Sequence, residues 1–228
     1  MTELINKLAG DHLAKHQADY WLQQEASVDG MLGGYGAISE VDIQGSRQLL
    51  RELTEMYDVE RTRALDVGAG IGRITEHLLI PAGFKAVDLL DIDQRFLDTA
   101  RDRLSSTGQL GDCFCSGFTQ FDFAGGSRRW DLIWMQWCAI YLNNDAFVDF
   151  FKRAAQALTP TGILVLKENT LSKSTADEFD DDDGSVTRGH QTLRRLFKKA
   201  GLELLRCKRQ AGFPPELYPV YFYVLRPL

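Results

Sequence analysis

Hydrophobic residues recur at helical spacing near the N-terminus, then fall into short apolar runs separated by further helical stretches. The first pattern predicts a helix over about residues 4–24 and a second from Ser39 to about Tyr57. Strands are predicted at residues 64–67, 86–90, 113–115, 130–135, 163–166, 202–205 and 220–225, with helices over about residues 74–79, 96–104, 147–158 and 193–200. Such alternation is typical of a doubly wound α/β sheet that is mostly parallel.

The predicted elements form a single domain with seven strands and an N-terminal helical cap. The 228 residues contain no internal repeat and no linker, which favours one domain over residues 1–228, with the cap in residues 1–60 and the α/β core in residues 61–228. The segment 30–36 contains four glycines, so we expect no regular element there. The Pro-Thr-Gly sequence at 160–162 is expected to end the helix before strand 163–166.

Composition narrows the class of protein. The net charge of −6 disfavours nucleic acid as a partner and suits a cationic one. The cysteines Cys113, Cys115, Cys138 and Cys207 form no Cys-x-x-Cys pair, so neither a disulfide framework nor a metal site is predicted. The sequence shows no signal-peptide pattern and no membrane-spanning apolar run. We therefore expect no membrane association, and a location in the cytoplasm, the nucleus or both.

The strongest local motif follows the first predicted strand. Asp66 is followed by glycines at 68, 70 and 72 and then by Arg73. A dinucleotide fingerprint places its third glycine one position later, so a nicotinamide oxidoreductase is disfavoured. The alternative without a ligand is a tight strand-to-helix turn. Arg73 can instead pair with a carboxylate and Asp66 with an ammonium group, the two charged groups in the amino-acid tail of S-adenosylmethionine.

A second acidic residue ends the next predicted strand. A carboxylate at Asp91 can accept hydrogen bonds from both hydroxyls of a ribose, an arrangement that NAD enzymes also use. Asp91 alone therefore does not distinguish the two cofactors. Together with the glycine motif and the Trp-Met-Gln-Trp sequence at 134–137, it is similar to the Rossmann-like seven-strand methyltransferases that depend on S-adenosylmethionine.

A more specific resemblance begins at residues 28–36, Val-Asp-Gly-Met-Leu-Gly-Gly-Tyr-Gly. This segment resembles the signature loop of the protein N-terminal methyltransferases, also called X-Pro-Lys N-methyltransferases. The resemblance continues in order through residues 69–75, 91–92, 133–137, 167–169, 180–188 and 216–221. It implies methyl transfer from S-adenosylmethionine to the free α-amine of proteins that begin Xaa-Pro-Lys or Xaa-Pro-Arg, so N-terminal peptides of such proteins are the expected partners of a monomeric enzyme.

The resemblance also implies which residues form the site. The expected cofactor-binding residues are Gly68, Gly70, Arg73, Asp91, Ile92, Asp93, Gly117, Phe118 and Gln136. The expected substrate-binding residues are Trp21, Leu32, Gly33, Asp180, Ser185, Leu217 and Tyr218. Trp137 joins them because a proline ring at the second position suits a slot with aromatic and aliphatic walls. On this assignment residues 1–60 include the substrate loop, and residues 61–228 form the cofactor-binding core.

The expected catalytic residues are Asp183, Asn169 and Tyr141. Methyl transfer needs a neutral amine, and an α-amine has a pKa of about 7.7–8.0, against about 10.4 for lysine. Members of the family can carry a histidine where Tyr141 stands, and a phenol with a pKa of about 10 is a poor base. The role of proton acceptor therefore passes to Asp183 or to water, and Asp183 and Asn169 are expected to orient the amine.

Two other functions remain open at this stage. A methyltransferase for a small amine would share the cofactor half of the protein but would not need the loop at 28–36 or the aspartates from Asp180 onward. A non-catalytic reader of peptide N-termini is an alternative because Tyr141 replaces the histidine. The run of four aspartates at 180–183 also has a plainer interpretation as a solvated loop.

Overall fold

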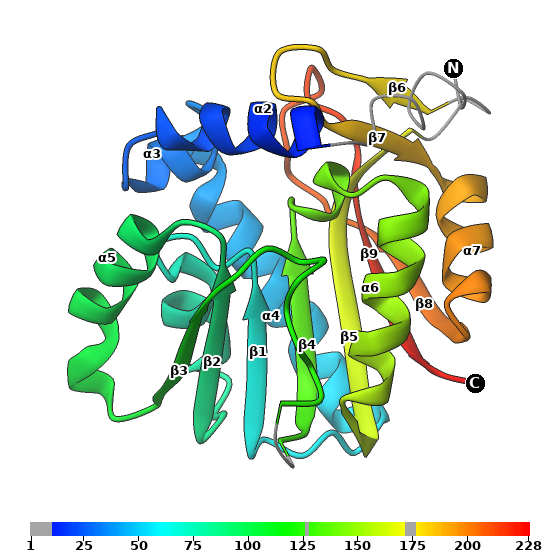
Figure 1. The fold of residues 1–228 in the computed structure, drawn as a ribbon. Coiled ribbons are helices and arrows are strands. Elements are labelled where there is room, and N and C mark those ends of the chain that lie inside the picture. The colour runs from blue at the N-terminus through cyan, green and yellow to red at the C-terminus, as the bar shows by residue number, and fades with distance from the viewer. Residues whose placement is uncertain (1–10, 126–127, 172–176) are drawn as a thin grey trace.

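The computed structural model describes residues 11–125, 128–171 and 177–228, in which nine strands join in one sheet (Figure 1). The strands are β1 (Arg63–Val67), β2 (Ala86–Asp91), β3 (Leu110–Cys115), β4 (Trp130–Gln136), β5 (Leu158–Leu171), β6 (Glu178–Phe179), β7 (Val186–Gly189), β8 (Leu202–Arg209) and β9 (Val220–Pro227). Seven of them have the order β3-β2-β1-β4-β5-β9-β8, and β6 and β7 form a hairpin beside the end of β5. Strands β1 to β5 are parallel, whereas β9 is antiparallel to both β5 and β8. The predicted mostly parallel sheet is confirmed, and the hairpin β6–β7 adds two strands to the seven that were predicted.

Helices cover both faces of this sheet. They are α2 (Asp11–Leu22), α3 (Val28–Met31), α4 (Ser39–Met56), α5 (Gln94–Leu104), α6 (Asn144–Gln156) and α7 (His190–Lys199), with the shorter turns η1 (Gly36–Ile38), η2 (Thr75–Leu79), η3 (Ser105–Thr107) and η4 (Ala139–Tyr141). Helices α6 and α7 pack on one face, and α4, η2 and α5 pack on the other (Figure 1). The doubly wound arrangement therefore has two hydrophobic cores, one on each side of the sheet.

The central strands are apolar because they are buried on both faces. Every residue of β4 is buried, and from Leu132 to Met135 its side chains alternate between the two cores. Ile133 and Met135 join the core under α6, whereas Leu132 and Trp134 join the core under α4. The parallel strands thereby become a rigid base, and the loops at their carboxyl ends can be held in place over it.

Of the N-terminal helices, α2 and α3 lie over the carboxyl-end edge of the sheet, whereas α4 packs on one of its faces (Figure 1). Helix α2 confirms the predicted first helix from Asp11 onward, and the part before that residue lies outside the described residues. Helix α4 begins at Ser39 as predicted and ends at Met56. The Gln17 side chain donates a hydrogen bond of 2.8 Å to the carbonyl of Gly184, which joins α2 to the hairpin β6–β7.

The prediction that residues 160–162 end a helix is wrong. Helix α6 already ends at Gln156, and the backbone N–H of Trp130 bonds the carbonyl of Ala157 at 3.0 Å. Strand β5 starts at Leu158, and its pairing with β4 then shifts before Ile163. The Pro-Thr-Gly segment therefore lies in an irregular part of the strand, where proline and glycine are tolerated because ladder pairing is interrupted.

One further local prediction differs from the structure, and one hairpin had no prediction. The glycine-rich segment contains one regular turn, because Ser27 caps α3 by accepting a hydrogen bond of 3.1 Å from the N–H of Gly30. The hairpin β6–β7 was not predicted, since a two-residue strand leaves no periodic signal. None of the described helices is both long and apolar enough to cross a lipid bilayer.

Candidate active site

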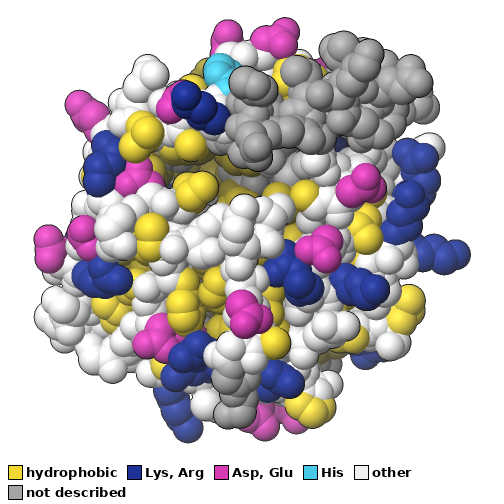
Figure 2. Space-filling view, viewed as in Figure 1, with side chains coloured by type: hydrophobic (Ala, Val, Ile, Leu, Met, Phe, Trp, Pro, Cys, Tyr) yellow, Lys and Arg dark blue, Asp and Glu magenta, His cyan; other side chains and the backbone are white. Residues whose placement is uncertain are grey.

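A cavity of about 510 Å³ lies where α2 and α3 face the carboxyl ends of β1, β2 and β4. Open α/β sheets bind ligands at this edge. In the space-filling view, hydrophobic side chains reach the surface between the N-terminal helices and the loops below them (Figure 2). The predicted site residues that line the cavity are Trp21, Gly68, Gly70, Arg73, Asp91, Ile92, Gly117, Phe118, Gln136, Trp137 and Tyr141.

The loop after β1 brings backbone, without side chains, to the cavity wall. Gly68 and Gly70 have φ angles of +69° and +53°, a region that residues with a Cβ rarely adopt. A Cβ on Gly68 would lie 2.6 Å from the sulfur of Cys138, and one on Gly70 would lie 2.6 Å from the sulfur of Met31. The two glycines therefore keep open a space that even a methyl group would close.

Asp91 is fixed at the end of β2 by two backbone N–H groups. Its carboxylate accepts hydrogen bonds from the N–H of Gly70 at 2.8 Å and from the N–H of Asp93 at 3.0 Å. Burial, the largest cause, raises the pKa of Asp91. Each carboxylate oxygen retains a further lone pair, so Asp91 can still accept hydrogen bonds from a ligand in the cavity.

Asp66 lines the same cavity from β1. Its carboxylate accepts hydrogen bonds from the N–H and the hydroxyl of Thr75, at 3.1 and 2.7 Å. Burial raises the pKa of Asp66 to about 6, although these hydrogen bonds and Arg73 act in the opposite direction. Asp66 therefore anchors the start of η2 and presents a carboxylate that is ionised at neutral pH.

Trp137 follows β4 in a strained conformation. Its φ angle of +54° is unusual for a residue other than glycine, and such strain is typical of functional sites. Its indole Nε1 is buried and has no hydrogen-bond partner among the described residues. An unsatisfied buried donor beside a cavity favours a ligand, or water, as its missing partner.

Tyr141 joins the cavity to the hairpin β6–β7. Its ring packs edge-on against Trp21, with 6.0 Å between ring centroids, and its hydroxyl donates a hydrogen bond of 2.9 Å to Asp183. Burial, followed by the charge of Asp183, raises the pKa of Tyr141 above that of an ordinary phenol. Tyr141 therefore remains a neutral donor, and Asp183 is the acceptor of the pair.

The acidic run forms the turn of the hairpin. The N–H of Asp180 bonds the carbonyl of Ser185 at 2.9 Å, and the N–H of Gly184 bonds the carbonyl of Asp180 at 3.0 Å. Asp180 is exposed, Ser185 is buried, and the N–H of Ser185 donates to the Asp183 carboxylate at 2.9 Å. The structure thus orders the aspartates in a turn beside the cavity, although these residues do not line it.

Several other predicted residues lie outside the cavity wall. Asn169 is half-buried in β5, opposite Val220 of β9. The hydroxyl of Tyr218 donates to Glu178 at 2.9 Å, which ties the segment before β9 to the hairpin. Leu32, Gly33 and Leu217 also lie outside the wall. Their substrate-binding roles stay predictions.

Asp93 caps the helix that follows Asp91. Its carboxylate caps α5 by accepting a hydrogen bond of 2.8 Å from the N–H of Arg95, and it forms an ion pair with the Arg95 side chain. The Arg95 hydrogen bonds lower the pKa of Asp93 against the opposing effect of its burial. Asp93 does not line the cavity, and these contacts fix the turn that follows Asp91; its cofactor-binding role stays a prediction.

Sequence reasoning missed several parts of the wall. Gln17, Ala18 and Met31 come from the cap, and Phe96 comes from α5. Sequence spacing carries no signal for them because they approach the cavity only through packing.

Lys167 was a usable signal, since a lysine in an otherwise apolar strand requires a buried partner. That partner is Asp42 of α4, which also contacts Arg73 and Gln136.

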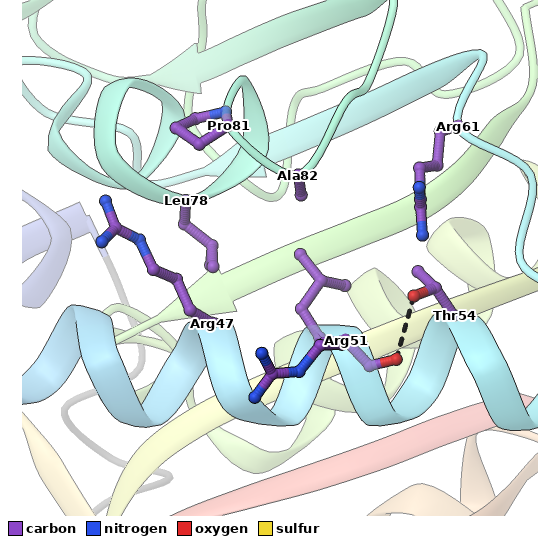
Figure 3. Close-up of a pocket in the computed structure, with 8 residues that line it drawn as sticks. Arg47, Arg51, Thr54, Arg61, Leu78, Pro81 and Ala82 are labelled. Carbon is purple, nitrogen blue, oxygen red and sulfur yellow. Dashed lines mark hydrogen bonds between the residues drawn. The ribbon is translucent and has the colours of Figure 1, made fainter.

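A second, smaller hollow of about 270 Å³ lies between α4 and η2 (Figure 3). Arg47, Arg51 and Arg61 surround an apolar floor that includes Leu50 and Leu78. Of the residues that line it, none is acidic, so it offers no carboxylate to a ribose or an ammonium group. The larger cavity is therefore the candidate cofactor site.

Comparison with known proteins agrees with this geometry. The family model described as AdoMet dependent proline di-methyltransferase matches residues 10–226. The chain belongs to this family. The N-terminal Xaa-Pro-Lys N-methyltransferase 1 of Xenopus tropicalis is 42% identical over 211 residues, which cover 91% of this chain and 92% of that protein. The alpha N-terminal protein methyltransferase 1 of Arabidopsis thaliana is 42% identical over 231 residues, covering 95% and 82%.

A solved structure of an S-adenosylmethionine-dependent methyltransferase from Leishmania major superposes with a TM-score of 0.89. It is 35% identical, and the match covers 96% of this chain and 87% of that one. As a member of the proline di-methyltransferase family, the chain is an enzyme that depends on S-adenosylmethionine. The expectations of family, fold, enzyme class and cofactor are confirmed.

The cavity fits this cofactor. Its volume lies within the range of about 300–1,000 Å³ that is usual for small-molecule sites. Asp91 presents lone pairs that a ribose can use, Arg73 presents a cation for a carboxylate, and Asp66 presents an anion for an ammonium group. A Cβ on Gly68 or Gly70 would lie against Cys138 or Met31, which explains why these two positions of the cavity wall carry no side chain.

Proposed function

We propose that this protein methylates the free α-amine of proteins that begin Xaa-Pro-Lys or Xaa-Pro-Arg after removal of the initiator methionine. The hydrogen bond between Tyr141 and Asp183 carries the proposal, because it joins the cofactor cavity to an acidic turn. A small amine would need no such turn beside the cavity. The names of the Xenopus tropicalis and Arabidopsis thaliana relatives support the same class of substrate.

The residues around this junction suit the first three residues of such a peptide. Trp21 and Trp137 give the cavity aromatic walls, against which the ring of a second-position proline can pack. Asp180 is exposed on the neighbouring turn, where it can pair with a cation at the third position. Leu217 and Tyr218 lie before β9, on a segment tied to the hairpin through Glu178, and would border the peptide there.

Asp183 is the proposed proton acceptor. Its carboxylate is held by the Tyr141 hydroxyl and by the N–H of Ser185, each at 2.9 Å, so it is oriented before a substrate arrives. S-adenosylmethionine supplies an electrophilic methyl group on its sulfonium. Asp183 and Asn169 accept hydrogen bonds from the amine and direct its lone pair, and Asp183 or water takes the proton that the amine must lose. Most of the rate enhancement then comes from orientation.

The test is a mass-spectrometric methylation assay with S-adenosylmethionine and two peptides, Ser-Pro-Lys-Arg-Ile-Ala and its N-acetylated form. We expect mass gains of whole methyl groups on the free peptide alone, because acetylation removes the nucleophilic amine. The same assay on Ser-Ala-Lys-Arg-Ile-Ala examines the proline slot. Methylation of the acetylated peptide, or of neither peptide despite normal cofactor binding, would contradict the proposal.

A further inference from the structure

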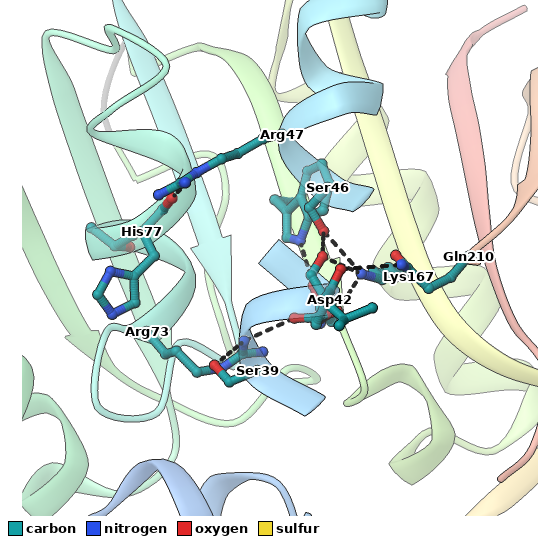
Figure 4. A network of polar contacts seen from close by, with 12 residues as sticks. Ser39, Asp42, Ser46, Arg47, Arg73, His77, Lys167 and Gln210 are labelled. Atoms are coloured by element: carbon teal, nitrogen blue, oxygen red, sulfur yellow. Dashed lines mark hydrogen bonds and ion pairs between the residues drawn. The ribbon is translucent and has the colours of Figure 1, made fainter. Parts of the chain in front are cut away.

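A buried polar network lies behind the cofactor cavity and is centred on Asp42 (Figure 4). Asp42 is on the first turn of α4 and has no exposed surface. Its carboxylate accepts hydrogen bonds from Arg73 at 2.8 Å and from Gln136 at 2.9 and 3.0 Å, and it forms an ion pair with Lys167. Three elements distant in sequence therefore meet at one carboxylate.

Two of these partners also line the cavity. Arg73 and Gln136 are both almost completely buried, and both are part of the cavity wall. Asp42 does not line the cavity. Any influence of Asp42 on a bound ligand therefore passes through Arg73 and Gln136.

The network fixes the orientation of the Gln136 amide. The indole N–H of Trp134 donates to the Gln136 oxygen at 3.1 Å, so the amide nitrogen must face Asp42. An indole can only donate and a carboxylate can only accept, which makes the reverse orientation unfavourable. The amide nitrogen donates to both oxygens of the Asp42 carboxylate, so the Gln136 side chain is held in one orientation where it lines the cavity.

Arg73 is held in a similar way. Its Nη1 donates to Asp42 and, at 3.3 Å, to the hydroxyl of Ser39. A guanidinium has five N–H donors, and among the described residues the other nitrogens of Arg73 have no hydrogen-bond partner. The side chain is thus fixed at one end and presents unused donors to the cavity, as a binding site for a carboxylate requires.

Lys167 is the second cation that pairs with the Asp42 carboxylate. It has no exposed surface, its Nζ also donates to the hydroxyl of Ser46 at 2.9 Å, and Nζ lies 4.5 Å from the centre of the Phe222 ring. Burial lowers the pKa of Lys167 to about 8, opposed by Asp42. Lys167 does not line the cavity, which makes it a control for purely structural effects of the network.

We propose that Asp42 is a positioning residue for the amino-acid tail of the cofactor, acting by holding Arg73 and Gln136 in the orientation that the tail requires. The inference rests on the assignment of the larger cavity to the cofactor within the proposed function. It makes the cap helix α4 part of the cofactor site, although α4 contributes no residue to the cavity wall. A network that served stability alone would not distinguish between parts of the ligand.

The test compares two ligands by isothermal titration calorimetry, without peptide. S-adenosylhomocysteine carries the amino-acid tail, whereas 5′-methylthioadenosine has the same adenosine and sulfur but no tail. The wild type is expected to bind S-adenosylhomocysteine more tightly. Asp42→Asn is expected to bind S-adenosylhomocysteine about ten- to a hundredfold more weakly, because a charge-assisted hydrogen-bond network is lost. Its affinity for 5′-methylthioadenosine is expected to change by less than about twofold.

Lys167→Met is the matched control, since it removes a buried charge of the same network and leaves Asp42 with Arg73 and Gln136. We expect this variant to retain the wild-type preference for the tail. If Asp42→Asn fails to fold, the double variant Asp42→Asn/Lys167→Met removes the unpaired ammonium and carries the same comparison. Equal loss for both ligands, no loss for either, or the same selective loss in Lys167→Met would overturn the proposal. Failure of the protein to methylate peptides would leave this binding test unaffected.

Discussion

The hydroxyl of Tyr141 donates a hydrogen bond of 2.9 Å to the carboxylate of Asp183, across 42 positions of sequence. Tyr141 belongs to the cavity wall and Asp183 to the hairpin turn, so the contact places a carboxylate next to the cavity wall. A histidine at position 141 could exchange a proton near neutral pH, whereas the tyrosine can only donate its hydrogen bond. In the proposed mechanism the role of proton acceptor therefore falls to Asp183 or to water.

Replacing Asp183 by asparagine is expected to lower kcat by about a hundredfold or more, because a positioned proton acceptor contributes that much to catalysis. Cofactor affinity should remain near that of the wild type, since Asp183 does not line the cavity. The measurements are steady-state kinetics with the free hexapeptide and calorimetry with S-adenosylhomocysteine. Asp181→Asn, on the same exposed turn, is the control. A near wild-type kcat for Asp183→Asn would remove Asp183 from the role of proton acceptor.

The pH profile tests the neutral state of Tyr141. Burial and Asp183 raise the pKa of this phenol, so it keeps its proton throughout the working range. We expect kcat/KM to rise as the substrate amine deprotonates at about pH 8 and then to stay level to about pH 10. Tyr141→Phe should give a curve of the same shape and lower height. A fall in rate above about pH 9 that disappears in Tyr141→Phe would show that the phenol ionises within the working range.

Gly70→Val is expected to abolish cofactor binding. The branched side chain would have to adopt a φ of +53° and would collide with Met31 across the cavity. Gly108→Ala is a suitable control, because Gly108 has a φ of +68° with no described atom within 4 Å of an added Cβ. That variant should show the backbone strain alone, as a lower melting temperature with normal affinity for S-adenosylhomocysteine. Normal binding by Gly70→Val would disprove the assignment of this loop.

Asp180 is expected to select a cation at the third position of the peptide. Asp180→Lys should lower kcat/KM for Ser-Pro-Lys-Arg-Ile-Ala by about tenfold or more, since repulsion replaces a charged hydrogen bond. The loss should be much smaller for the peptide with glutamine at the third position. Asp182→Lys introduces the same charge two residues away and serves as the control. Equal losses of kcat/KM on both peptides would indicate a general effect of charge and no selection of the third residue by Asp180.

Glu168 should make stability depend on pH. Burial raises its pKa from 4.5 to about 8, and one carboxylate oxygen has no hydrogen-bond partner among the described residues. Between these values the folded chain holds a proton that the unfolded chain has lost, so the free energy of unfolding falls as pH rises, by up to about 1.4 kcal/mol per pH unit. This contribution is fully present below about pH 4.5 and lost by about pH 8. Urea denaturation of Glu168→Gln over that range should give a flatter dependence than the wild type, and parallel curves would contradict the assignment.

The sequence by itself determined the fold class and the cofactor loop. Both depend on signals that are local along the chain: apolar strands that must be buried, helical spacing between them, and glycines where the backbone needs a positive φ at residues 68 and 70. The resemblance in the segment 28–36 carried the expected substrate class. The cytoplasmic or nuclear location, the monomeric state and the individual roles of the site residues stay predictions.

Only the tertiary structure decided which polar groups face one another. Asp42 is an ordinary helical position in the sequence, yet packing of α4 against β4 and β5 places its carboxylate among Arg73, Gln136 and Lys167. Asp93 adjoined the cofactor motif in sequence, but its side chain caps α5. From the sequence, the four aspartates from Asp180 were also compatible with a solvated loop. In the structure they lie in the turn of the hairpin β6–β7, where Asp183 accepts the hydrogen bond of Tyr141. Long-range contacts of this kind are fixed by the packing of whole elements, and the spacing of residues along one chain does not encode them.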